Sequence, residues 1–85
     1  MQFGAVVGHA TATVKHKGFV GSKLLVVQPL RDTGETDGDP ILAIDRIGSG
    51  PGMRVIISSD GKAARQAVGS KDSPVRWLVV GVVDG

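Results

Sequence analysis

The segment QFGAVVGHATATVKH, residues 2–16, carries the pattern from which the fold class is inferred. From Gly4 to Val14 its even positions hold only small or apolar residues, whereas from His9 onward its odd positions are polar. This alternation is typical of a β-strand with one buried face. The glycines within the stretch favour a bent strand, as a small barrel requires.

The rest of the chain also predicts mainly strands. Four more are expected, at residues 23–28, 41–45, 53–59 and 75–84, and Pro29 is expected to end the first of them. Only residues 62–68 are rich in good helix formers, which predicts a helix of about two turns. The chain is therefore expected to be a single all-β domain over residues 1–85, a small five-stranded OB-like barrel with one short helix.

Two of the predicted strands are apolar on both faces. In residues 23–28, Leu24 and Val26 point one way and Leu25 and Val27 the other. In the last strand, one face holds Trp77, Val79 and Val83, and the opposite face holds Leu78, Val80 and Val82. A small barrel has one interior, so the second face needs another cover. The short helix could supply it, but we favour a neighbouring subunit, because 85 residues without cysteine form only a marginal core alone.

Composition argues against several classes of protein. The net charge is only +2 and the Lys and Arg residues are scattered, so no nucleic-acid partner is expected. Two Phe and one Trp are also few for stacking bases, although an OB-fold module that binds single-stranded nucleic acid or a small ligand remains the alternative. The longest apolar stretch, residues 77–83, is too short to span a membrane, and the first residues lack a signal-peptide pattern, so we expect an intracellular protein with no membrane partner.

No pattern of residues indicates catalysis, a metal or a cofactor. His9 and His16 are seven apart on one predicted strand, which places them on opposite faces. No serine lies in a strand–turn–helix context typical of a nucleophile. The glycine-rich segment 48–52 precedes a strand rather than a helix, so it does not fit a phosphate-binding loop. It is expected to be a turn with positive φ angles or close backbone approach, including the case in which several copies crowd on a symmetry axis.

Five segments in order resemble one known family. They are GAVVG (4–8) with ATVKH (12–16), GSKLLVVQPL (21–30), AIDRIGSGPG (43–52), ARQ (64–66), and PV (74–75) followed by VGVVD (80–84). Together they resemble the EutN/CcmL family of bacterial microcompartment pentamer proteins, over nearly the whole chain. The resemblance implies an OB-like barrel and a structural role rather than an enzyme.

The same resemblance implies a particular assembly. Homopentamers of this kind cap the five-fold vertices of a shell, a carboxysome or a metabolosome, in the cytoplasm, beside hexameric microcompartment shell proteins. A flat sheet of hexamers closes into a polyhedron only at five-fold points. Cyclic, heterologous contacts that close after five copies would make each barrel a wedge in such a point.

Site residues follow from the resemblance by position. The pore or inter-subunit loop falls on Gly48, Ser49, Gly50, Pro51 and Gly52. It also makes Ala64, Arg65 and Gln66 candidates for the contact with a neighbouring subunit or shell tile. Arg46, Arg76 and Trp77 are further candidates from the residues themselves, because arginine is a common anchor at subunit contacts and Trp77 lies on a strand with two apolar faces.

The chain also departs from the family pattern at three places. Met53 stands where an acidic residue usually follows the glycine loop, Lys62-Ala63 where serine is usual, and Arg76-Trp77 where small or acidic residues are common. Contacts made by the missing acid or serine therefore do not transfer to this chain.

Overall fold

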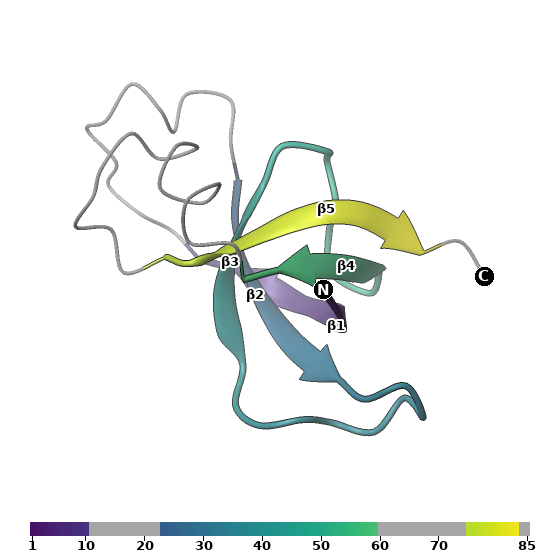
Figure 1. Ribbon diagram of the computed structural model, residues 1–85. Helices are drawn as coiled ribbons and strands as arrows, with labels where there is room; N and C mark the ends of the chain where they lie inside the picture. Colours follow the sequence, from purple (N-terminus) through teal and green to yellow (C-terminus); the bar gives the residue numbers. More distant parts are fainter. Residues whose placement is uncertain (11–22, 60–74, 84–85) are drawn as a thin grey trace.

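The computed structural model describes residues 1–10, 23–59 and 75–83, which form a closed all-β barrel (Figure 1). Its strands are β1 (Gln2–His9), β2 (Lys23–Leu30), β3 (Ile41–Asp45), β4 (Arg54–Ser58) and β5 (Trp77–Val83). Around the barrel they follow the order β1-β2-β3-β5-β4, with β4 pairing back to β1. The predicted five-stranded all-β barrel is confirmed. The helix predicted at 62–68 and the end of the first predicted strand, 11–16, lie outside the described residues.

Pro29 does not end β2, as the sequence analysis expected. The strand runs on to Leu30, and Pro29 pairs with Gly4 of β1. The pairing of β2 with β3 extends only as far as Val27. Beyond that point β2 has a single strand neighbour, and such an edge position tolerates a residue without an N–H group.

Two β-bulges interrupt the alternation of the strands. One lies between Val6 and Gly8 of β1 and leaves Val7 outside the pairing with β2. The other lies where β4 pairs with β5, and it leaves Val80 outside the register. Because the second bulge shifts the side chains of β5, Val82 packs against the barrel core, on the opposite face from the one that simple alternation predicts.

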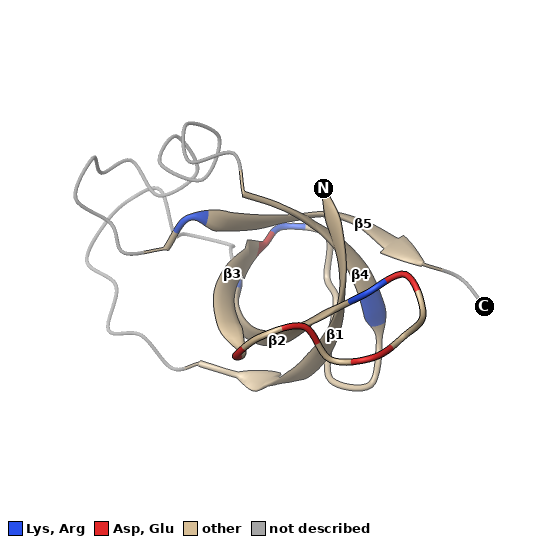
Figure 2. Cartoon of the chain, turned by 60° about the horizontal axis from the view of Figure 1, so that its bottom comes forward, with Lys and Arg blue, Asp and Glu red and all other residues tan. Residues whose placement is uncertain are grey.

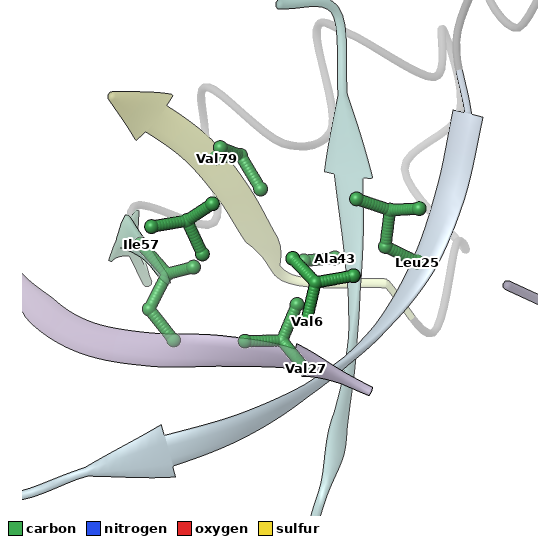
Figure 3. Close-up of a cluster of buried hydrophobic side chains, with 7 residues drawn as sticks. Val6, Leu25, Val27, Ala43, Ile57 and Val79 are labelled. Atoms are coloured by element: carbon green, nitrogen blue, oxygen red, sulfur yellow. The ribbon is translucent and has the colours of Figure 1, made fainter. Parts of the chain in front are cut away.

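The barrel interior is a single apolar cluster (Figure 3). The buried members are Val6, Leu25, Val27, Ala43, Val55, Ile57 and Val79. Gly4 lies on the inner side of β1, where an added Cβ would come within 2.5 Å of Val27 Cγ1. Glycine is therefore needed at this position to let β1 and β2 approach each other around the core.

A second, smaller cluster lies on the outer side of the sheet. Ile44 and Val75 are buried there, and the half-buried Leu24 and Leu78 pack against them. Part of the second apolar face predicted for β2 and β5 is thus closed within the chain itself. In the part of the chain that the structure describes, no helix is long and apolar enough to cross a membrane.

Candidate functional site

The loop between β3 and β4, residues 46–53, is organised by a buried carboxylate. Asp45, the last residue of β3, is 1% exposed. Its Oδ1 atom accepts a hydrogen bond from the Ile47 amide (2.9 Å), and its Oδ2 atom accepts from the amides of Gly48 (3.0 Å) and Ser49 (2.6 Å). The Ser49 hydroxyl, also buried, donates to Oδ1 at 3.1 Å. Four donors thus bind one carboxylate, which holds the first half of the loop in a fixed shape.

The second half of the loop is bound to β1. The Gly52 amide donates to the Val6 carbonyl at 3.0 Å, and the Val6 amide donates to the Met53 carbonyl at 2.9 Å. Within the loop, the Met53 amide donates to the Gly50 carbonyl at 3.1 Å. Both ends of the loop are therefore anchored to the barrel, while Pro51 and Gly52 are exposed.

The glycines of this loop differ in what they require. Gly48 and Gly52 have φ angles of +103° and +88°, so the predicted positive φ is confirmed at both positions. Gly50 has no positive φ, and a Cβ added to it would meet nothing within 4 Å. Within the part of the chain that the structure describes, neither strain nor contact with other residues requires glycine at position 50.

Of the remaining predicted site residues, Arg46 is the first residue of the loop, and Arg76 and Trp77 lie at the start of β5. Arg46 is exposed and directly follows Asp45, and Arg76 is exposed just before β5. Trp77 is half-buried and packs against the barrel core, next to Ala43 of β3. Ala64, Arg65 and Gln66 lie outside the described residues.

Sequence reasoning missed Asp45 as the residue that shapes the loop. A signal for it was present, because aspartate at the end of a strand, followed closely by Gly and Ser, is typical of a side chain that binds the next backbone amides. The spacing alone did not show that the carboxylate would be buried.

The polar loop 31–40 is the most acidic part of the chain. It carries Asp32, Glu35, Asp37 and Asp39, which are four of the eight acidic residues (Figure 2). Asp37 accepts a hydrogen bond from the Gln2 side chain at 2.9 Å and lies 4.0 Å from the Arg31 guanidinium. The connection between β2 and β3 is thus a polar loop.

These groups hold the backbone of the loop in place. The two buried polar side chains, Asp45 and Ser49, bond to each other and to loop amides, and within the described ranges no buried side-chain N or O atom lacks a partner. No group of three His, Cys, Asp or Glu residues that could hold a metal ion occurs among residues 1–10, 23–59 and 75–83. The arrangement presents a rigid, glycine-rich loop on a small barrel.

Comparison with known proteins identifies the class of such a barrel. Residues 1–84 match the family model described as "Ethanolamine utilisation protein EutN/carboxysome". The chain therefore belongs to the EutN/CcmL family, and the resemblance seen in the sequence is confirmed.

Individual relatives agree over almost the full length. The bacterial microcompartment shell vertex protein EutN of Escherichia coli K12 is 43% identical over 99% of this chain and 87% of its own length. The shell vertex protein GrpN of Rhodospirillum rubrum is 39% identical over 99% and 93%, respectively. The carboxysome shell vertex protein CcmL of Gloeobacter violaceus is 36% identical over 99% and 83%.

Solved structures show the same fold. An EutN structure has a TM-score of 0.80 at 43% identity, covering 99% of this chain and 86% of that one. The structure of GrpN from Rhodospirillum rubrum, described as a pentameric microcompartment shell protein, has a TM-score of 0.78 at 38% identity and covers 100% and 95%.

Proposed function

We propose that this chain is a structural protein of a bacterial microcompartment shell, in the cytoplasm, where its homopentamers cap the five-fold vertices. The observation that carries the proposal is the match of residues 1–84 to shell vertex proteins, one of which is described as pentameric. The solved structures cover almost the whole of this chain.

The conformation of the glycine loop supports the proposal that this loop lies near the five-fold axis of the pentamer. Nothing among the described residues of one chain requires glycine at position 50, because its φ is not positive and no atom there lies within 4 Å of an added Cβ. Five copies of a loop around an axis would fill that space, and only the smallest side chain would then fit. The Asp45 carboxylate would hold each copy of the loop in the shape that such crowding requires.

The proposed role requires a subunit shape that fits a five-fold vertex, and it requires no catalytic group. The buried Asp45 carboxylate accepts hydrogen bonds from loop amides and from the Ser49 hydroxyl. We therefore propose that the protein is not an enzyme, and that its partners are further copies of itself and hexameric shell proteins.

The alternative, binding of single-stranded nucleic acid, finds little support in the described residues. Phe3 is the exposed aromatic side chain there that could stack on a base. It lines a hollow together with Arg31, Asp32 and Asp37, and this mixture of charges is not the basic groove that a nucleic-acid backbone needs.

Native mass spectrometry of the purified chain is the direct test. A discrete species of five subunits is expected, and a monomer would overturn the proposal. A second test is co-expression with a hexameric shell protein. Closed shells should form with this chain and only open sheets or tubes without it, and identical assemblies in both cases would contradict the vertex role.

A further inference from the structure

The tip of the loop between β3 and β4 is a tight turn that Met53 closes. The Met53 amide donates a hydrogen bond to the Gly50 carbonyl at 3.1 Å. Pro51 and Gly52 occupy the two central positions, and the φ of +88° at Gly52 fits a type II turn. Gly52 and Met53 are also bonded through their backbone to Val6 of β1. The backbone of Met53 is therefore fixed on both sides of its side chain.

The side chain of Met53 folds back over this turn. Its Sδ atom accepts a hydrogen bond from the Gly50 amide at 3.2 Å. A thioether is a weak acceptor, so this bond is weaker than those that the Asp45 carboxylate accepts from the amides of Gly48 and Ser49. The first half of the loop is thus held by a charged group, and the tip is held by a sulfur atom.

The sulfur atom of Met53 is also open to small reagents. Met53 is 37% exposed, and the hydrogen bond from Gly50 occupies only one of the two lone pairs of its sulfur. The chain has two methionines and no cysteine, and the other methionine, Met1, is 93% exposed at the end of the chain. Of these two residues, Met53 is the one whose sulfur binds the backbone of the glycine loop.

We infer that Met53 is an oxidation site that makes the tip of the loop sensitive to peroxides. The free lone pair of Sδ attacks one oxygen of hydrogen peroxide, and the O–O bond breaks. The hydroxide that leaves takes the proton of the transferred oxygen and becomes water. The thioether is oxidised to a sulfoxide and the peroxide is reduced to water, so the reaction needs no other reactant.

The sulfoxide of Met53 does not hold the Gly50 amide as the thioether does. Sulfur carries a partial positive charge in a sulfoxide, and the acceptor is the oxygen atom instead. This oxygen is added on the exposed side of the sulfur, because the lone pair that faces the Gly50 N–H is already occupied. The Gly50 amide therefore loses its acceptor and the tip loosens, whereas Asp45 still holds the amides of Gly48 and Ser49.

Peptide mapping by mass spectrometry tests the oxidation site, after the folded protein has been treated with dilute hydrogen peroxide. Each methionine should gain one oxygen atom, and Met53 should react no more than about tenfold more slowly than Met1, because both are exposed. Unaltered circular dichroism would show that the barrel stays folded during the treatment. Oxidation of Met53 only after the chain has been unfolded would overturn the inference.

Amide hydrogen exchange, measured by NMR, tests the effect on the loop. Exchange of the Gly50 amide should become at least about threefold faster after oxidation, and exchange of the Gly48 and Ser49 amides should stay the same. Met53→Leu is the matched control, because leucine keeps an apolar side chain and removes the sulfur. In this variant the Gly50 amide should already exchange fast, and peroxide should not change its rate although it still oxidises Met1.

The outcomes separate this inference from the proposed function. A Gly50 amide that exchanges at the same rate before and after oxidation, or in Met53→Leu as in the original chain, would overturn the role of the sulfur and leave the pentamer intact. Oxidation of Met53 requires one folded chain and no second copy. A native mass spectrum that shows only a monomer would therefore overturn the vertex role and leave this inference standing.

Discussion

The cluster around Ile44, on the outer side of β3, and the exposed residues on the outer side of β1 differ in how their apolar side chains are covered. Ile44, on the outer side of β3, is 0% exposed and forms a cluster with Val75, Leu24 and Leu78. Phe3, on the outer side of β1, remains 43% exposed. Both residues belong to the same closed sheet (Figure 1). Membership of the barrel therefore does not explain why Ile44 is buried and Phe3 is exposed.

This difference separates apolar residues that stabilise the fold of each copy from apolar residues that can stabilise contacts between copies. Burial of a side chain within the chain contributes to the free energy of folding of each copy. Apolar surface that stays open contributes only when a second molecule covers it. Substitutions on the closed side should therefore change the free energy of unfolding, and those on the open side should change the subunit count.

The largest effect is expected at Ile44. Ile44→Ala removes buried methyl groups from the closed cluster and should lower the free energy of unfolding by about 3 kcal/mol. Leu42→Ala, two residues away on the same side of β3, starts from 40% exposure and should cost less than about 1 kcal/mol. Urea unfolding at one fixed protomer concentration would measure both. Equal losses would mean that the two positions are equally covered, which contradicts the comparison.

The next effect is expected at Asp45, at the base of the glycine loop. Asp45→Asn replaces Oδ2 by an amide group, which would face the donating amides of Gly48 and Ser49. The loss should be about 2 kcal/mol in the free energy of unfolding, with faster hydrogen exchange of those two amides. Ser49→Ala removes one hydrogen bond from the same carboxylate and should cost about 1 kcal/mol. An Asp45→Asn chain as stable as the original would show that the carboxylate does not hold the loop.

The sequence predicted most of the barrel because alternation and turn residues are local signals. All five strands were placed, and the third predicted strand matches β3 at both ends. The end of the second strand was predicted wrongly, because a strand can continue through Pro29 where β3 no longer pairs with β2, and the sequence does not show where that pairing ends. The bulge at Val80 is also set by the pairing of β4 with β5, which no local pattern reveals.

The candidate site was predicted less completely than the fold. Positive φ at Gly48 and Gly52 followed from residue type, and the structure confirms it. The role of Asp45 depends on burial at the end of the barrel, which is a property of the assembled sheet. The interface roles of Arg46 and Arg76 stay predictions, because they concern a second subunit.

A smaller effect is expected at Gly4, which lies between the outward-facing Phe3 and Ala5 but points into the barrel. Gly4→Ala would place a Cβ 2.5 Å from Val27 Cγ1 and should cost about 1.5 kcal/mol through overpacking. Adding Val27→Ala should make the Gly4→Ala change less costly than it is in the original chain, and a double-mutant cycle measures that coupling. Purely additive losses would mean that β1 and β2 are not in such close contact at this point.

The smallest effect on unfolding is expected at Gly50, where the chain leaves space open. Gly50→Ala meets nothing within 4 Å and needs no positive φ, so the free energy of unfolding of separated chains should stay the same or rise by up to about 1 kcal/mol. Gly48→Ala is the matched control, because its φ of +103° should make alanine cost about 1 kcal/mol. Unfolding at low protomer concentration measures both, and native mass spectrometry then shows whether Gly50→Ala weakens the pentamer, as crowding on the axis requires. If the two variants are equally destabilised, the requirement for glycine at position 50 arises within the single chain. Gly50 would then no longer support the proposal that the loop lies at the five-fold axis.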